Sequence, residues 1–159
     1  MPSTKSKRQP VQPPYALWRG RLIAKLALVR AGLTVQDAAA PQPFDLLAST
    51  PDGFYFLGKV DAYSSMHGRQ PTPNGSPDGY RWPVEASVLR AAADVNLPVV
   101  LFVVDADREV GHYARLDRPR REQQTEGVSL TSNRNLAPES ISALVTKLRE
   151  DWGVTRRPA

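Results

Sequence analysis

An uninterrupted apolar segment near the middle of the chain limits its possible folds more than any other feature. Residues 97–104 read Leu-Pro-Val-Val-Leu-Phe-Val-Val, preceded by Asn96 and followed by a polar turn at 105–109. A run of this length and composition is typical of a strand at the centre of a sheet. Because such a strand is apolar on both faces, both sides of the sheet need cover. The segment therefore predicts a sheet with helices on both faces.

Segments with helical or strand periodicity surround this run in a regular order. Apolar residues recur at helical spacing in three segments, 15–31, 83–95 and 136–152. Shorter apolar or alternating segments predict strands at 33–35, in a hairpin at 44–61, at 110–116 and at 128–130. Leaving aside the short segment 128–130, the order is helix, strand, hairpin, helix, strand, strand, helix. It predicts an α/β domain with a mixed central sheet flanked by helices.

Both ends of the chain and one internal segment lack such periodicity. Residues 1–14 are polar, basic and proline-bearing, which predicts a disordered arm, and residues 153–159 form a short basic tail. Residues 62–81 are rich in proline and glycine and predict a long irregular loop. We therefore expect a single domain over residues 15–152, between the arm and the tail.

The composition excludes several kinds of site. The chain has 159 residues, no cysteine and two histidines, His67 and His112, so disulfides, thiolate metal sites and clusters of imidazoles are excluded. Any metal would be held by carboxylate and backbone oxygens, which suit Mg²⁺ or Mn²⁺. The longest apolar run is too short to cross a bilayer, and no signal-peptide pattern is visible. We expect no membrane association and a cytoplasmic location.

The predicted hairpin at 44–61 carries charged residues where a core would exclude them. Asp45 stands at the beginning of its first strand, and Lys59 stands near the end of its second. Between the strands lies a Thr50-Pro51-Asp52-Gly53 turn, of the kind that closes a β-hairpin. Two interpretations are open for Asp45: it caps the sheet edge or pairs with Lys59 as an ion pair, or both residues belong to a catalytic centre.

Several short motifs, in this order of elements, resemble the core of a known family. They are Gly20-Arg21-Leu22 in a first helix ending at Arg30-Ala31-Gly32, Phe44-Asp45-Leu46, Lys59, the strand 96–105 and the helix start 136–140. The chain resembles the PD-(D/E)XK nuclease superfamily over roughly residues 15–152, most closely small bacterial domains of unknown function. This resemblance implies a restriction-endonuclease-like core of helix, three strands, helix and strand.

The resemblance also implies a chemistry and its residues. Asp45 would be the catalytic, metal-binding acid and Lys59 the catalytic lysine of Mg²⁺- or Mn²⁺-dependent phosphodiester hydrolysis. The sequence departs from the family pattern at position 57, where Leu57 replaces the second acid. Asp61 lies two residues beyond Lys59, on the same strand face, and Glu85 lies near the start of the next helix. Both are candidates for the missing metal ligand.

Basic residues predict contact with a polyanion. The formal net charge is +5 and the pI is about 9.8, which favours polyanionic partners. A modestly basic surface with disordered basic tails is the alternative interpretation of the same charge. The candidate nucleic-acid-binding residues are Arg69, Arg81, Arg118, Arg120 and Arg121. The first two are interleaved with aromatic residues, as in proteins that stack on bases. One of these aromatic residues, Trp82, has a core-anchor interpretation as well.

Three functions remain open from the sequence. The preferred one is a nucleic-acid-associated protein, with DNA as the expected partner and an incomplete nuclease centre. The second is an active Mg²⁺-dependent DNA endonuclease in which Asp61 or Glu85 supplies the missing acid. The third is a protein-interaction module of a defence or mobile-element system. Many relatives cleave as dimers, so a homodimer is a candidate assembly.

Overall fold

The structure is a computed structural model that describes residues 12–39, 43–68, 70–73, 75, 79–117 and 127–153. Its main sheet has five strands in the order β1 (Thr34–Asp37), β2 (Leu46–Ser49), β3 (Tyr55–Tyr63), β6 (Val99–Asp105) and β7 (Val110–Arg115). Neighbours are antiparallel except β3 and β6, which are parallel. The helices are α1 (Pro14–Arg30), α2 (Ala86–Asp94) and α3 (Pro138–Asp151). The predicted α/β class with a mixed sheet is confirmed.

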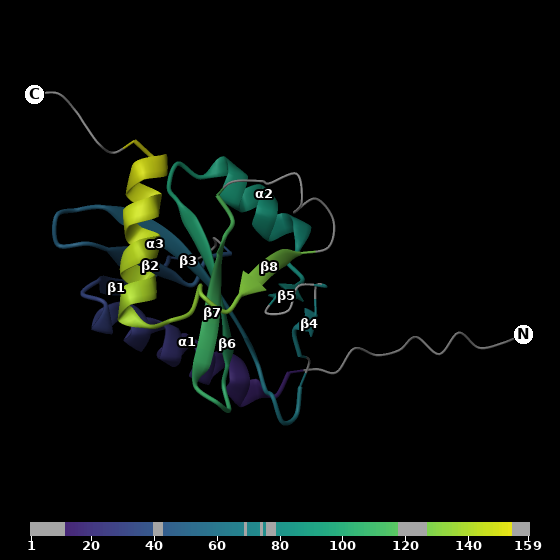
Figure 1. The fold of residues 1–159 in the computed structure, drawn as a ribbon. Coiled ribbons are helices and arrows are strands. Elements are labelled where there is room, and N and C mark those ends of the chain that lie inside the picture. Colours follow the sequence, from purple (N-terminus) through teal and green to yellow (C-terminus); the bar gives the residue numbers. More distant parts are fainter. Residues whose placement is uncertain are drawn as a thin grey trace, which may run out of the picture.

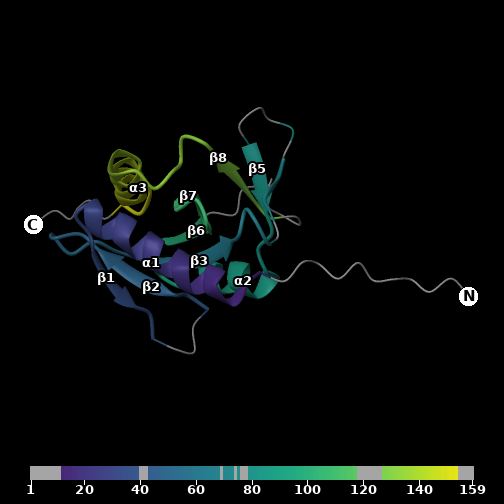
Figure 2. The same ribbon diagram turned by 90° about the horizontal axis from the view of Figure 1, so that it is seen from below.

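The central strand β6 is buried along its whole length, as the apolar run predicts. Its residues Val100, Phe102 and Val104 pack in one core cluster with residues of α1 and α3, while Val99, Leu101 and Val103 pack in a second cluster with residues of α2. Figure 1 shows α3 and α2 on opposite sides of the view, and Figure 2 shows α1 lying across the main sheet. Both faces of the sheet are therefore covered, because the central strand is apolar on both faces.

The first helix ends where the sequence predicts. Gly32 has a φ of +90°, a conformation that glycine adopts without steric cost. The amides of Gly32 and Leu33 donate to the carbonyls of Val29 (3.0 Å) and Leu28 (3.1 Å), which are the two hydrogen bonds of a Schellman motif. The cap turns the chain back so that β1 can pair with β2.

The predicted hairpin is confirmed as β2 and β3. Its turn is closed by the amide of Thr50, which donates to the carbonyl of Phe54 at 2.9 Å, and by a positive φ of 91° at Gly53. Below the turn the register places Leu46 opposite Gly58, so Asp45 stands opposite Lys59 on the neighbouring strand. The hairpin thus brings together the two charged residues that the sequence singles out.

The segment 62–81, predicted to be irregular, has no strand over 64–68 and 70–71, but the prediction was wrong for its ends and for residues 72–73, which form strands. Strand β3 continues to Tyr63, while β4 (Thr72–Pro73) and β5 (Gly79–Trp82) form a second sheet with β8 (Val128–Thr131). The last predicted strand therefore pairs with β5 (Figure 1). Pairing between segments this far apart leaves no local periodicity, and the prolines and glycines conceal it further.

The boundaries at the two ends differ slightly from prediction. Residues 12–14 of the predicted arm are described, and Pro14 already belongs to α1. Most of the arm (1–11) and of the tail (154–159) lies outside the described residues. None of the described helices combines the length and the apolar content that crossing a membrane requires.

Candidate nuclease-like site

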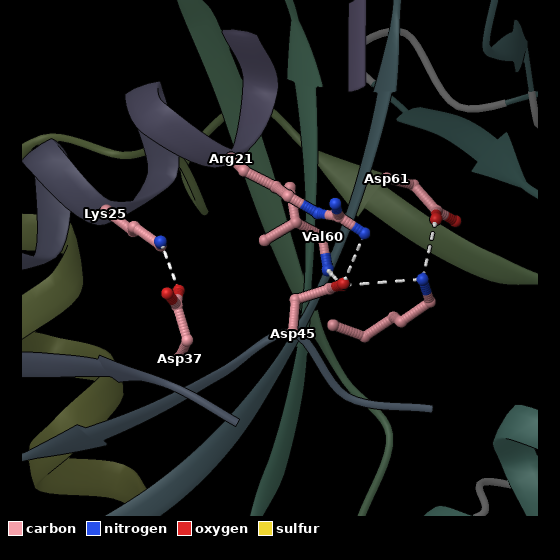
Figure 3. Close-up of polar contacts among 7 residues, drawn as sticks. Arg21, Lys25, Asp37, Asp45, Val60 and Asp61 are labelled. Atoms are coloured by element: carbon pink, nitrogen blue, oxygen red, sulfur yellow. Dashed lines mark hydrogen bonds and ion pairs between the residues drawn. The ribbon is translucent and has the colours of Figure 1, made fainter. Parts of the chain in front are cut away.

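The site lies where β2 begins and its neighbour β3 runs on. The backbone of Asp45 extends the sheet by one residue: its amide donates to the carbonyl of Gly58 at 2.8 Å, and its carbonyl accepts from the amide of Ala38 at 3.0 Å. The next amide of β3, that of Val60, donates to the Asp45 side chain at 2.6 Å (Figure 3). The carboxylate thus takes the place of a strand neighbour and caps the edge of the sheet.

Two cationic side chains complete the surroundings of this carboxylate. Arg21 of α1 donates from Nη2 to Oδ1 of Asp45 at 2.8 Å, and Lys59 of β3 donates from Nζ to Oδ2 at 3.4 Å (Figure 3). The Asp45 side chain is only 11% exposed, so these contacts form in a partly desolvated place where they are stronger than at an open surface. Both carboxylate oxygens of Asp45 are engaged by protein donors.

Two close approaches place these side chains. A Cβ at Gly20 would lie 2.5 Å from the Cβ of Ala62, so α1 can sit against β3 only because position 20 is glycine. Arg21, the next residue, is thereby brought to Asp45. A Cβ at Gly58 would lie 2.5 Å from Leu46, so this glycine is needed for packing between β2 and β3. The structure therefore gives Gly58 a packing role.

Lys59 stands between two carboxylates. Its Nζ lies 3.4 Å from Asp45 and 3.7 Å from Oδ1 of Asp61, which shares its strand face (Figure 3). The second oxygen of Asp61 accepts from the indole Nε1 of Trp82 at 2.9 Å. The site is therefore a row of alternating positive and negative side chains, whose charges neutralise one another: Arg21, Asp45, Lys59 and Asp61.

Trp82 anchors the far end of this row. Its ring is 5% exposed, and its centroid lies 5.6 Å from that of Tyr63. Burial, and secondarily the negative charge of Asp105, raises the pKa of Tyr63 to about 12, so its phenol stays neutral. Of the two interpretations of Trp82, the structure supports the core anchor.

Leu57, at the position where the resemblance predicts a second acid, is a buried core residue. It packs in the cluster that contains residues of α2. Within the described ranges, no three His, Asp or Glu side chains come together in a way that could hold a metal ion. Asp45 and Asp61 are brought to one lysine, but Glu85 does not complete a three-carboxylate group with them.

A cleft opens beside this row of charges. It has a volume of about 700 Å³ and contains Lys59, Asp61 and Glu85 in its lining, together with Leu17 of α1, Trp82 and the start of α2. Lys59 is 20% exposed and Asp61 30%, so both side chains reach solvent here. The predicted residues Lys59, Asp61 and Glu85 therefore share one surface depression, with Asp45 buried behind the lysine.

The predicted nucleic-acid-binding residues fall mostly outside the described part of the chain. Arg69, Arg118, Arg120 and Arg121 lie there, as do both basic termini. Arg81 lies on β5, partly exposed, and is engaged with another group. The structure thus gives a position to one of the five arginines.

Arg21 is the contributor that sequence reasoning missed as a site residue. It belongs to the Gly20-Arg21-Leu22 motif, but it lies 24 residues from the aspartate that it contacts. Its sequence neighbours do not reveal that contact. The only available signal was the small residue at position 20, which marks a close approach of the helix.

The chain was compared with protein-family models, curated proteins and solved structures. No family model, no curated protein and no solved structure matches it.

Proposed function

We propose that this protein binds nucleic acid, with DNA as the expected partner, through a PD-(D/E)XK-like domain whose nuclease centre no longer takes a metal. Nucleic-acid binding is proposed from the net charge of +5 and the basic pI, and the loss of the metal is proposed from the surroundings of Asp45. Its carboxylate, the counterpart of the metal-binding acid, accepts from Arg21, Lys59 and the amide of Val60. A cation such as Mg²⁺ would have to displace two positive charges to reach it.

The order of elements supports the same ancestry. Leaving aside the small second sheet, α1, β1, β2, β3, α2 and β6 follow one another as helix, three strands, helix and strand. Asp45 and Lys59 lie on its second and third strands, within 3.4 Å of each other. The acid at position 57 has become a core leucine, and an arginine of the first helix occupies the remaining aspartate. The nuclease geometry is kept while its metal ligands are replaced.

Nucleic-acid binding is tested by fluorescence anisotropy with a labelled duplex and a labelled single strand. At low salt, near 50 mM, we expect binding that weakens steeply as salt rises, because phosphate contacts release counterions. Charge reversal of Arg118, Arg120 and Arg121 to glutamate should weaken binding by about tenfold or more. Reversal of Arg30, Arg90 and Lys147 changes the net charge equally and is expected to have a much smaller effect.

The same preparations distinguish binding from cleavage. Incubated with plasmid and branched DNA and either Mg²⁺ or Mn²⁺, the protein should leave the DNA intact. Cleavage that disappears in both Asp45→Asn and Lys59→Ala would instead establish the endonuclease alternative. Absence of any binding at low salt would overturn the nucleic-acid proposal and leave a domain that acts through protein contacts.

A further inference from the structure

Helix α1 carries apolar side chains on the face that points away from the sheet. Its inward residues, including Ala24 and Leu28, are fully buried, as a helix packed on a sheet requires. Yet Trp18 is 67% exposed, Leu22 and Leu26 are each 48% exposed, and Val29 is 54% exposed. Their spacing places them on one side of the helix. Large apolar side chains gathered on the exposed face of a helix mark an interaction surface more often than chance exposure, so this outward stripe indicates a missing neighbour.

The stripe forms one wall of a groove that is separate from the nuclease-like cleft. The groove has a volume of about 970 Å³, and its other wall is formed by the start of β7 and the segment that leads into α3. Trp18, Leu22 and Leu26 face Val110, Leu136 and Pro138 across it. Val110 is itself 50% exposed. A concave and largely apolar surface of this kind suits a helix better than a flat bilayer.

The charges along the groove indicate what kind of helix it takes. Helix α1 contains four basic residues and no acidic one. Arg19 on the groove side is neutralised by Glu109 at 2.6 Å. Arg30 also lines the groove, is exposed, and makes no ion pair with any described residue. The groove therefore presents an apolar floor bordered by an unneutralised positive charge.

The chain itself does not supply a matching occupant. Outside the described ranges, the large apolar residues are only Met1, Val11 and Val154, and the two termini carry five basic residues and no acidic residue. In a second copy packed through its own α1, three of the four basic residues of that helix are already paired with carboxylates, but its Arg30 would add a second unpaired positive charge to the same interface. Charge complementarity thus favours a different protein.

We propose that the groove between α1 and β7 is a docking site for an amphipathic helix of a partner protein, with acidic residues beside its apolar stripe. The apolar residues of that helix pack on Trp18, Leu22 and Leu26, and an acidic residue pairs with Arg30. This interaction is independent of the nuclease-like site, because none of the residues lining one depression lines the other.

The test uses the full chain and a fluorescein-labelled synthetic peptide of about five helical turns. The peptide carries leucines at helical spacing with flanking glutamates. One control peptide has lysines in place of the glutamates, and another has the glutamate composition in scrambled order. We expect saturable binding of the acidic amphipathic peptide, measured by anisotropy, and binding at least about tenfold weaker for both controls.

Variants of the protein locate the binding. Leu22→Gln combined with Leu26→Gln should weaken binding of the acidic peptide by about tenfold or more. Arg30→Glu should weaken the acidic peptide and strengthen the lysine peptide, a reversal that a merely structural change does not produce. Met66→Gln is the control, because Met66 is 73% exposed and lies outside the groove. It should leave peptide binding unchanged. Circular dichroism and Tm confirm that each variant folds.

Each other outcome overturns the proposal. Equal binding of all three peptides would show nonspecific attraction. A dimer in analytical ultracentrifugation that Leu22→Gln/Leu26→Gln dissolves, without peptide binding, would identify a second copy as the occupant. Binding of phosphatidylglycerol-containing vesicles without peptide binding would identify a membrane surface. No binding of peptide, copy or vesicle would leave the stripe without a docking role.

Discussion

At the scale of single residues, Asp45 has a structural role in the sheet. The carboxylate caps the β3 ladder through the amide of Val60 and holds α1 to the sheet through Arg21. Lys59, the other residue of the family pattern, is held between Asp45 and Asp61. All of these contacts are made within the protein and need neither a metal nor a substrate.

This interpretation predicts that removing Asp45 destabilises the fold. Asp45→Ala leaves the Val60 amide without its acceptor and Arg21 and Lys59 without their shared carboxylate. We expect a loss of about 1–3 kcal/mol in the free energy of unfolding, measured by urea denaturation. Asp94→Ala, on the exposed side of α2, is the control and should stay within about 0.5 kcal/mol of the parent. An Asp45→Ala protein as stable as the parent would contradict a structural role.

At the scale of elements, a second polar network ties α3 to the main sheet. Arg115, the last residue of β7, donates to both oxygens of Asp117 at 3.1 and 2.7 Å and also pairs with Asp151 at the end of α3. The indole of Trp152 donates to Asp117 at 2.6 Å, and the Asp117 side chain is fully buried. Core packing through Leu144 and Leu148 attaches the helix, and this network fixes its C-terminal end.

Removing one charged partner of this network should lower the free energy of unfolding. Arg115→Met leaves the buried carboxylate of Asp117 without its cation, and removing one partner of a buried pair costs about 3–5 kcal/mol. We expect a destabilisation of about 3 kcal/mol by urea denaturation. Arg90→Met, on the exposed surface of α2, removes the same charge and should change the stability by less than about 0.5 kcal/mol. Similar values for the two variants would show that the network contributes little.

At the scale of the whole molecule, α1 separates two surfaces of different character. One is the charged cleft with Lys59 and Asp61, and the other is the apolar groove with Trp18, Leu22 and Leu26. His112 of β7 lines the groove and forms a backbone bridge with Asn135. Burial lowers the pKa of its imidazole below the ordinary value of 6.5, because a charged ring is poorly solvated there.

The position of His112 predicts how the stability of the whole chain depends on pH. With its folded-state pKa lowered, the folded protein binds fewer protons than the unfolded chain as the pH falls below 6.5. The contribution of neutral His112 to the free energy of unfolding is therefore present above pH 6.5, and it is lost as the pH falls toward the folded-state pKa. Urea denaturation across this pH range should show a decrease in the free energy of unfolding as the pH falls. We expect His112→Gln to remove this decrease and His67→Gln, a change at an exposed site, to retain it. The same decrease in His112→Gln would contradict the prediction.

Sequence alone determined the elements whose pattern is local. The apolar run at 97–104 specified a central strand covered on both faces, Gly32 specified the end of α1, and the Thr50–Gly53 turn specified the β2–β3 hairpin. These features depend on periodicity and backbone conformation over a few neighbouring residues, and both can be predicted from the sequence of those residues. The pairing of Asp45 with Lys59 followed from the hairpin for the same reason.

Only the tertiary structure decided which distant segments meet. It brought Arg21 to Asp45 across 24 residues, joined β5 to β8 in a second sheet, and left the outer face of α1 exposed. In the sequence, Trp18, Leu22 and Leu26 are indistinguishable from core residues. The helical pattern does not show which apolar side of the helix packs against the sheet. Likewise, the sequence around Asp45 does not show which cationic group will neutralise the carboxylate, because Arg21 is 24 residues away. Both are decided by long-range packing.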